Sequence, residues 1–331
     1  MSTPLKIFLI VCAVLVLIFV AILLNSLLFG KKPITNTHSI SEPFENISIS
    51  TLVADVNVLP SSDGKATVIC QEKEIMSHSV SVADGTLKID CIDNRRWYEY
   101  IGFNFFGSQS VTVYLPDDAY RALNISGHTS NISVPSDFSF SDIAVSATTG
   151  NISCLASASG DITTTASTGS ITFSGNSGGN IALTTTTGSI TVSDTKASAL
   201  SLSVSTGRVS ASDIVLAGEL SVKVSTGDSI LSDIECKSLK STGNTGDITL
   251  CRVITTGEFN IERSTGDVTL EACDAGNIKI KTDTGDVTGT LNSTKIFQTH
   301  SDTGRINVPQ SNEGNPCQIE TDTGNIFISI C

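Results

Sequence analysis

The sequence "STGDVTLEACDAGNIKIKTDTGDVTG", residues 264–289, contains the five residues Thr-Gly-Asp-Val-Thr twice. The first copy begins at Thr265 and the second begins 19 residues later, at Thr284. A repeat with such a short period is typical of a fold that stacks small units on one another. The two copies therefore indicate a repeat architecture rather than a catalytic motif.

The same Thr-Gly pair recurs along the second half of the chain in steps of 19 or 20 residues. Each of the ten glycines follows a threonine, and only Ser, Thr, Asn or Asp precedes that threonine. The glycines are Gly150, Gly169, Gly188, Gly207, Gly227, Gly246, Gly266, Gly285, Gly304 and Gly324. Glycine permits the positive φ of a sharp corner, and a short polar side chain can hydrogen-bond the turn backbone. We therefore interpret each pair as a corner.

Each repeat contains a second, weaker turn signal, for example at Gly218 and Gly276, so each coil should hold two short strands. Apolar and polar residues alternate between the turns, as in "IKIK" at 278–281, which is the pattern of a half-buried strand. In one coil Ser229 precedes Ile230 and shifts the apolar residue by one place. We predict a β-bulge there.

These patterns predict an all-β fold, a single-stranded β-solenoid of about ten coils over residues 127–331. Strands of successive coils would lie about 4.8 Å apart, so the rod would be about 45–50 Å long. One coil cannot bury its apolar face alone, whereas stacked coils share a continuous core. The core would be aliphatic, because the chain of 331 residues has only 5% aromatic residues.

Residues 7–24 form 18 uninterrupted apolar positions, long enough to span a bilayer. We therefore predict an N-terminal transmembrane anchor at 1–33, followed by a juxtamembrane linker at 34–43. A cleaved signal peptide is the alternative, but no small-x-small cleavage site follows the apolar run. Lys6 on one side and Lys31 and Lys32 on the other leave the orientation undecided by charge.

The rest of the chain is acidic. Residues 1–33 contain three lysines and no acidic residue, so residues 34–331 carry 33 acidic and 17 basic side chains, a net charge of −16. Anionic lipid and nucleic acid would repel such a rod. We therefore expect no nucleic-acid partner, and a rod that stands away from the membrane surface.

Residues 44–126 keep the strand pattern without the strict repeat, which predicts an irregular β cap for the solenoid. The hydrophobic anchor, the strand "VTVYLP" at 111–116 and the run "GNISCLASASGDITTTASTGSITF" at 150–173 together resemble the bacterial putative-adhesin domain of unknown function, the toast-rack type associated with envelope stress. The resemblance covers residues 44–331. It implies a single N-terminal helix with an extracytoplasmic solenoid, and it supplies no catalytic residues.

Eight cysteines lie beyond the anchor, without a CxxC pair or a Cys/His metal spacing. We expect free structural thiols, because Cys154, Cys251, Cys273 and Cys331 lie at repeat positions where a small buried thiol would fit. Cys70 and Cys91 form the one pair that neighbouring strands could join in a disulfide.

Three enzymatic or specialised interpretations are weaker. "DTG" at Asp283, Asp302 and Asp322 matches the aspartic-protease tripeptide. Other coils have STG or TTG at the same corner, so the aspartate is better explained as a turn residue. A polysaccharide lyase would need long loops, which 19- or 20-residue coils do not provide. An ice-binding face would need a second threonine in each coil, whereas ordinary strand propensity explains the single column. That column is Thr172, Thr191, Thr249, Thr269 and Thr288. We expect no enzyme and no cofactor.

Two functions remain open. The chain could be a binding or adhesion scaffold at the cell envelope that displays a rigid acidic rod to an unknown protein or cell-wall partner. It could instead be an accessory or sensor subunit of an envelope-stress signalling system.

An aromatic cluster is the first candidate site. Aromatic residues dominate binding hot spots, so these could form a partner-binding patch, with capping of the first coil as the alternative. They are Trp97, Tyr98, Tyr100, Phe103, Phe105 and Phe106.

The C-terminal coil, which ends at Cys331, is the second candidate. Cys331 comes directly after an alternating apolar strand of this coil. We therefore expect the strand to leave an open edge that favours end-to-end self-association, with a Cys331 disulfide as an option.

A column of carboxylates is the third candidate. The residue after the corner glycine is Asp in four successive coils, with Arg208 before them and Arg305 after them. Hard cations take several oxygen ligands, so weak calcium binding is conceivable, with a solvated acidic edge as the alternative. The residues of this calcium hypothesis are Asp267, Asp283, Asp286 and Asp302.

Overall fold

The computed structural model describes residues 12, 14, 16, 17, 20, 34–73, 75–95 and 109–331. The predicted anchor therefore lies mostly outside the described residues, and the aromatic cluster lies wholly outside them. No helix within the described part of the chain is both long and apolar enough to cross a bilayer.

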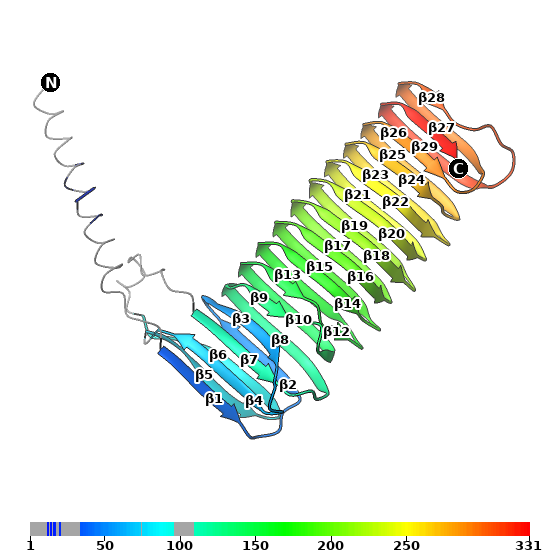
Figure 1. The fold of residues 1–331 in the computed structure, drawn as a ribbon. Helices are drawn as coiled ribbons and strands as arrows, with labels where there is room; N and C mark the ends of the chain where they lie inside the picture. Colours follow the sequence, from blue (N-terminus) through cyan, green and yellow to red (C-terminus); the bar gives the residue numbers. More distant parts are fainter. Residues whose placement is uncertain are drawn as a thin grey trace, which may run out of the picture.

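The protein is an all-β solenoid in the form of a long, twisted rod (Figure 1). Two 15-stranded sheets, here named sheet A and sheet B, face each other along its length. In spatial order sheet A contains β1 (Ile34–Ile40), β4 (Ala66–Glu72), β7 (Gln109–Leu115), β3 (Ala54–Pro60), β9 (Ile132–Val134), β11 (Ile152–Cys154), β14 (Ile171–Asn176), β16 (Ile190–Ala197), β18 (Val209–Leu216), β20 (Ser229–Cys236), β22 (Ile248–Thr255), β24 (Val268–Cys273), β26 (Val287–Leu291), β30 (Ile326–Ile330) and β28 (Ile306–Asn307).

The strands of sheet B also follow one another from the cap to the far end of the rod. From the cap outward it contains β5 (Met76–Ala83), β6 (Thr86–Asp93), β2 (Asn46–Thr51), β8 (Tyr120–Thr129), β10 (Ser139–Thr149), β13 (Ile162–Thr168), β15 (Asn180–Thr187), β17 (Ala199–Thr206), β19 (Glu219–Thr226), β21 (Ser238–Thr245), β23 (Glu258–Thr265), β25 (Asn277–Thr284), β29 (Asn315–Thr323) and β27 (Lys295–Thr303), with the short β12 (Ser157–Ala158) beside β10.

Each regular coil crosses from sheet A to sheet B and back, as the two turn signals predict. In β19, Leu220, Val222 and Val224 are buried while the residues between them face outward. Identical positions of successive coils pair in register, for example Ile248 with Val268. Burial of one Val, Leu or Ile side chain stabilises a fold by about 1.5–3 kcal/mol, so the shared core accounts for the stacking.

The Thr-Gly corners require glycine for a steric reason beyond turn propensity. Gly246 has a φ of +127° and its N–H donates a 2.9 Å hydrogen bond to the carbonyl of Thr265 in the next coil. A Cβ atom at this position would overlap the carbonyl oxygen of Gly227 in the preceding coil. The corners stack so closely that the repeat has to keep glycine in register.

The bulge predicted after Gly227 is wrong. Strands β18 and β20 pair without a register shift, with Val209 opposite Ser229 and Ser210 opposite Ile230. Ser229 is buried in the position of the usual aliphatic residue, and Ile230 is 39% exposed. The Ser229 Oγ accepts a hydrogen bond from a buried side chain, that of Arg263, which is described below.

A second bend lies within the strands of sheet A, and the glycine pattern does not reveal it. Five non-glycine residues at equivalent positions of successive coils have φ between +46° and +57°. They are Asp194, Asp213, Asp233, Arg252 and Ala272. Asp is among the few residues that tolerate this conformation, which explains three of the five.

The cap contains the antiparallel part of the fold. β1 pairs β4, β4 pairs β7, and β5 pairs β6, all antiparallel. β3 and β2 then pair parallel with β9 and β8, so the two sheets run from the cap into the solenoid without a break.

The order of the last two coils differs from the order of the chain. β29 and β30 insert between the β25–β26 coil and the β27–β28 coil, although β27 and β28 come first in the sequence. β26 pairs with β30 along its whole length, whereas β28 covers the other edge of β30 only at Ile326 and Phe327. The edge predicted to be open at the C-terminal strand is therefore partly covered. The outermost strands at this end are β27 and β28 (Figure 1). Self-association at the C-terminal coil stays a prediction.

Candidate functional site

A shallow groove runs across the outer face of sheet A where the cap meets the solenoid. Its volume is about 540 Å³. Seven of its ten lining residues carry an amide or a hydroxyl group, one carries a carboxylate and two are isoleucines. The lining residues are Asp55, Asn57, Asn131, Ile132, Ser133, Asn151, Ile152, Ser153, Ser170 and Thr172. Sequence reasoning missed this groove, because it combines residues of the irregular cap with residues of the first coils.

One side of the groove is a ladder of side-chain oxygens along the corner. Asp55 Oδ1 accepts a 2.8 Å hydrogen bond from the backbone N–H of Asn131, and Asn131 Oδ1 accepts one of 3.0 Å from Asn151 N–H. Asn151 Oδ1 in turn accepts from Ser170 N–H at 2.8 Å. Each short polar side chain therefore caps a backbone donor of the following coil, and these groups are held in fixed positions.

The predicted aspartate column continues the same ladder. Asp247 Oδ1 accepts from Asp267 N–H, and Asp267 Oδ1 accepts from Asp286 N–H, both at 2.8 Å. Asp286 is followed by Asn325 and only then by Arg305, because the last two coils exchange places. The expectation that Arg305 directly ends the carboxylate run is therefore wrong.

The four residues of the calcium hypothesis are spread further apart than the sequence order suggests. The coil that contains Asp322 lies between the coils of Asp283 and Asp302. Asp302 Oδ1 is 2.9 Å from Nε2 of His300, on its own strand. Calcium binding at these residues stays a prediction.

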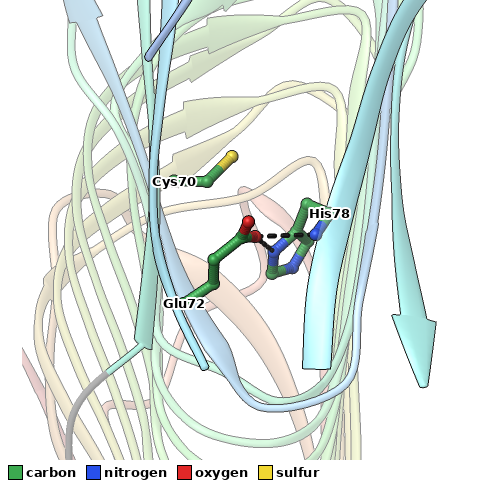
Figure 2. A group of neighbouring side chains, drawn as sticks. All are labelled: Cys70, Glu72 and His78. Atoms are coloured by element: carbon green, nitrogen blue, oxygen red, sulfur yellow. Dashed lines mark hydrogen bonds and ion pairs between the residues drawn. The ribbon is translucent and has the colours of Figure 1, made fainter. Parts of the chain in front are cut away.

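A buried polar cluster lies inside the cap, between the two sheets (Figure 2). Cys70 and Glu72 project from the same face of β4, and His78 projects toward them from β5. His78 Nδ1 lies 3.0 Å from Glu72 Oε2, and the His78 backbone N–H donates to the same oxygen at 2.7 Å. One potential ligand atom from each of the three residues lies within 4.8 Å of the others.

Further polar groups surround the cluster. Asn36 Nδ2 donates a 2.6 Å hydrogen bond to Glu72 Oε1, and Thr51 Oγ1 lies 3.3 Å from His78 Nε2. Gln109 is only 6% exposed, and its Oε1 has no hydrogen-bond partner among the residues that the structure describes. Buried polar atoms without partners are rare, so this end of the cap has hydrogen-bonding capacity that the protein atoms leave unused.

Cys70 and Cys91 are both free thiols in the structure. Burial, and secondarily the charge of Glu72, raises the pKa of Cys70 to about 12. Burial also raises the pKa of Cys91, which lies opposite His78 in the β5–β6 ladder. The sequence "CQEKEIMSH" at 70–78 has neither paired cysteines nor a standard Cys/His metal spacing, so sequence reasoning missed it. Strand alternation and the crossing of the chain from β4 in sheet A to β5 in sheet B bring its three ligand types together.

A second buried charge lies in the solenoid core. Arg263 is 4% exposed, and its Nη2 donates to Ser241 Oγ at 2.9 Å and contacts Ser229 Oγ at 3.4 Å. Burial lowers the pKa of this guanidinium to about 10. A Cβ on Gly243 would lie 2.7 Å from Arg263 Nη1, so the glycine leaves space for the arginine. These contacts explain why a serine replaces the core aliphatic residue at position 229.

The architecture and the repeat define the class of protein, an extended parallel β-solenoid with an antiparallel cap. The family model of the toastrack domain DUF4097 matches residues 44–232 and again residues 217–331, so the chain belongs to this family.

Solved structures with a similar arrangement include a putative adhesin from Parabacteroides distasonis ATCC 8503, at 14% identity and a TM-score of 0.42, over 88% of this chain and 98% of that one. A putative adhesin from Bacteroides fragilis NCTC 9343 is 13% identical with a TM-score of 0.39, over 91% and 98% of the two chains. A putative lipid binding protein from Parabacteroides distasonis is 16% identical with a TM-score of 0.37, over 78% and 97%. No curated protein matches the sequence.

Proposed function

We propose that the chain is a non-enzymatic binding scaffold, anchored in the membrane by its N-terminal segment and displayed outside the cytoplasm at the cell envelope. The groove on sheet A carries this proposal. Its amide and hydroxyl groups are held in a fixed array by the corner ladder, and a rigid array binds with a small loss of conformational entropy.

The chemistry of the groove favours a neutral, polyhydroxylated ligand. Asn side chains donate and accept hydrogen bonds, and Ser and Thr hydroxyls do the same. The net charge of −16 over residues 34–331 would repel an anionic polymer. We therefore infer that the ligand is a glycan strand of the cell wall, with a protein partner as the alternative.

Co-sedimentation with purified cell-wall glycan tests this function. The full chain in detergent should sediment with the glycan, and Ser153→Arg with Thr172→Arg should abolish this by filling the groove. Thr165→Arg, on the exposed face of sheet B, is the matched control and should bind like the wild type. Equal sedimentation of the groove variant and the control would contradict the assignment of the groove.

The membrane topology has its own test. Protease added to intact spheroplasts should digest residues 34–331 if they lie outside the cytoplasm, whereas a cytoplasmic marker protein should remain intact. The proposed orientation would be refuted if the protease left the solenoid intact in intact spheroplasts and digested it only after the spheroplasts were lysed.

The alternative function, an accessory or sensor subunit for envelope stress, predicts a different result. Cells that lack the chain would then fail to induce an envelope-stress response, and the groove variant would restore induction as well as the wild type does.

A further inference from the structure

We propose that Cys70, Glu72 and His78 form a binding site for a zinc ion inside the cap, with Cys70 Sγ, one carboxylate oxygen of Glu72 and His78 Nδ1 as ligands. This site is separate from the groove on the outer face of sheet A. The proposal therefore stands or fails independently of the proposed function.

The donor set matches zinc. A thiolate, an imidazole and a carboxylate are the three protein ligand types that zinc uses, and calcium or magnesium would require oxygen ligands alone. Zinc bonds of about 2.0–2.3 Å place the ligands of a tetrahedral site about 3.3–3.8 Å apart. The three ligand atoms already lie within 4.8 Å of one another. Small side-chain rotations would therefore suffice to close the site.

Charge balance supports a bound cation. Glu72 is 3% exposed, and burial of a carboxylate is costly unless a positive group compensates it. Zinc with one thiolate, one carboxylate and one neutral imidazole forms a neutral unit.

The neighbouring hydrogen bonds orient the ligands as metal sites require. With His78 Nδ1 on the metal, Nε2 carries the proton and donates to Thr51 Oγ1 at 3.3 Å. Asn36 Nδ2 holds Glu72 Oε1 at 2.6 Å, which leaves Oε2 directed at the imidazole. Both contacts fix the ligand orientation before an ion arrives.

The unpartnered Oε1 of Gln109 is an independent sign of a missing group. The β4–β7 ladder pairs Gln71 with Ser110, which places Gln109 level with Glu72 on the adjacent strand. Its side chain is buried on the same inner face, and within the described part of the chain its Oε1 has no hydrogen-bond partner. A water molecule in the fourth position of the zinc ion would donate a hydrogen bond to an acceptor of this kind.

Metal titration of the full chain, purified under reducing conditions and stripped with a chelator, tests the site. Cobalt(II) should bind once per chain and produce a thiolate-to-cobalt charge-transfer band, and zinc should then displace it. Cys70→Ser and His78→Gln should each weaken zinc binding at least tenfold in competition with a chromophoric chelator.

Cys154→Ser is the matched control, because Cys154 is fully buried in the first coils and, among the described residues, belongs to no group of potential metal ligands. It should retain the wild-type zinc affinity, and circular dichroism should show that all variants fold. The proposal is overturned if no stoichiometric zinc binds or if Cys70→Ser binds zinc as tightly as Cys154→Ser. A Cys70–Cys91 disulfide in chain purified without reductant would overturn it too.

Discussion

Lys295 Nζ lies 2.5 Å from Asp274 Oδ1 and 2.6 Å from the carbonyl oxygen of Ala275, and the lysine side chain is fully buried. Lys295 begins β27, the outermost strand of sheet B, whereas Asp274 follows β24, in an earlier coil. The pair therefore ties the outermost coil to the body of the solenoid across the inserted β29–β30 coil.

Asp274→Ala should destabilise the end of the solenoid by about 3–5 kcal/mol, because it leaves the buried ammonium of Lys295 without its counter-ion. The double variant Asp274→Ala with Lys295→Met should recover most of that loss, since no buried charge remains. Denaturant unfolding measures both. If the double variant is less stable than the single one, the charge is not the cause.

The same pair predicts a pH dependence. Burial alone would raise the pKa of Asp274, but hydrogen bonds from Lys295, Ser293 and the Ala275 N–H together hold it below 3.8. A carboxyl with a lowered folded-state pKa contributes stability above its unfolded value and loses it as the pH falls through the folded value. The stability advantage of the wild type over Asp274→Ala should therefore be constant near neutral pH and shrink below pH 3.8. Unfolding curves across this range measure the difference.

Gly246→Ala should destabilise the solenoid by about 3 kcal/mol or more, because the added methyl overlaps the carbonyl of Gly227 and the residue keeps a φ of +127°. Gly64→Ala is the control. Gly64 also has a positive φ, of +71°, but no atom lies within 4 Å of the added Cβ. It should cost only the roughly 1–2 kcal/mol of a left-handed alanine. Equal losses would mean that stacking does not require the corner glycine.

Asp267→Ala should cost about 0.5–1.5 kcal/mol because the N–H of Asp286 loses its acceptor. Asp267→Asn should be nearly neutral, since the amide oxygen can accept the same bond. Thermal unfolding distinguishes the two. A loss of stability in Asp267→Asn as large as in Asp267→Ala would show that the charge matters more than the ladder.

The calcium hypothesis makes a separate prediction for this column. Millimolar calcium should raise the melting temperature of the wild type, and Asp267→Asn with Asp286→Asn should abolish the rise. Identical melting with calcium and with chelator would leave the column as a hydrogen-bonded ladder alone.

Alkylation should separate the cysteines by burial. Burial raises the pKa of Cys154 to about 11 and that of Cys317 to about 12, so at pH 8 about one thiol in a thousand or fewer is a reactive thiolate. Cys331 is exposed. Iodoacetamide followed by mass spectrometry should therefore modify Cys331 in the native chain, and Cys154 and Cys317 only after denaturation. Rapid native labelling of Cys154 would show that the coils open locally.

The sequence was sufficient to predict the coils because their cause is local and repeated. Every corner glycine faces the corner of its neighbour, so the same steric demand recurs at a fixed spacing. The order of the last coils was not predictable in this way, because 295–307 and 315–330 carry the same pattern and either could stack on β26. Contacts distant in sequence decide between them, among them the pair of Lys295 and Asp274.

The buried sites were hidden for a related reason. Strand alternation places Arg263 on the inward face of β23, after Phe259 and Ile261. The sequence does not show that Ser229, Ser241 and Gly243 from other coils make room for it there. Glu72 and His78 are neighbours because the chain crosses from β4 in sheet A to β5 in sheet B, and both side chains lie between the sheets. Strand alternation predicts which side chains face inward but not which residues of other strands they meet, whereas burial and hydrogen-bond geometry identify these pairs.

The exchanged order of the last two coils constrains how the chain can reach its final state. In a solenoid whose coils stack in chain order, each newly synthesised coil can pair at once with the coil that precedes it in the sequence. Here residues 295–307 are synthesised before residues 315–330, with which they pair in the final structure. Until then they must remain unpaired or pair with another strand. The last two coils can therefore take their final places only after residues 315–330 have been added. A chain that ends after residue 310 would lack β29 and β30 and would expose the unpaired edges of β25 and β26 to proteases.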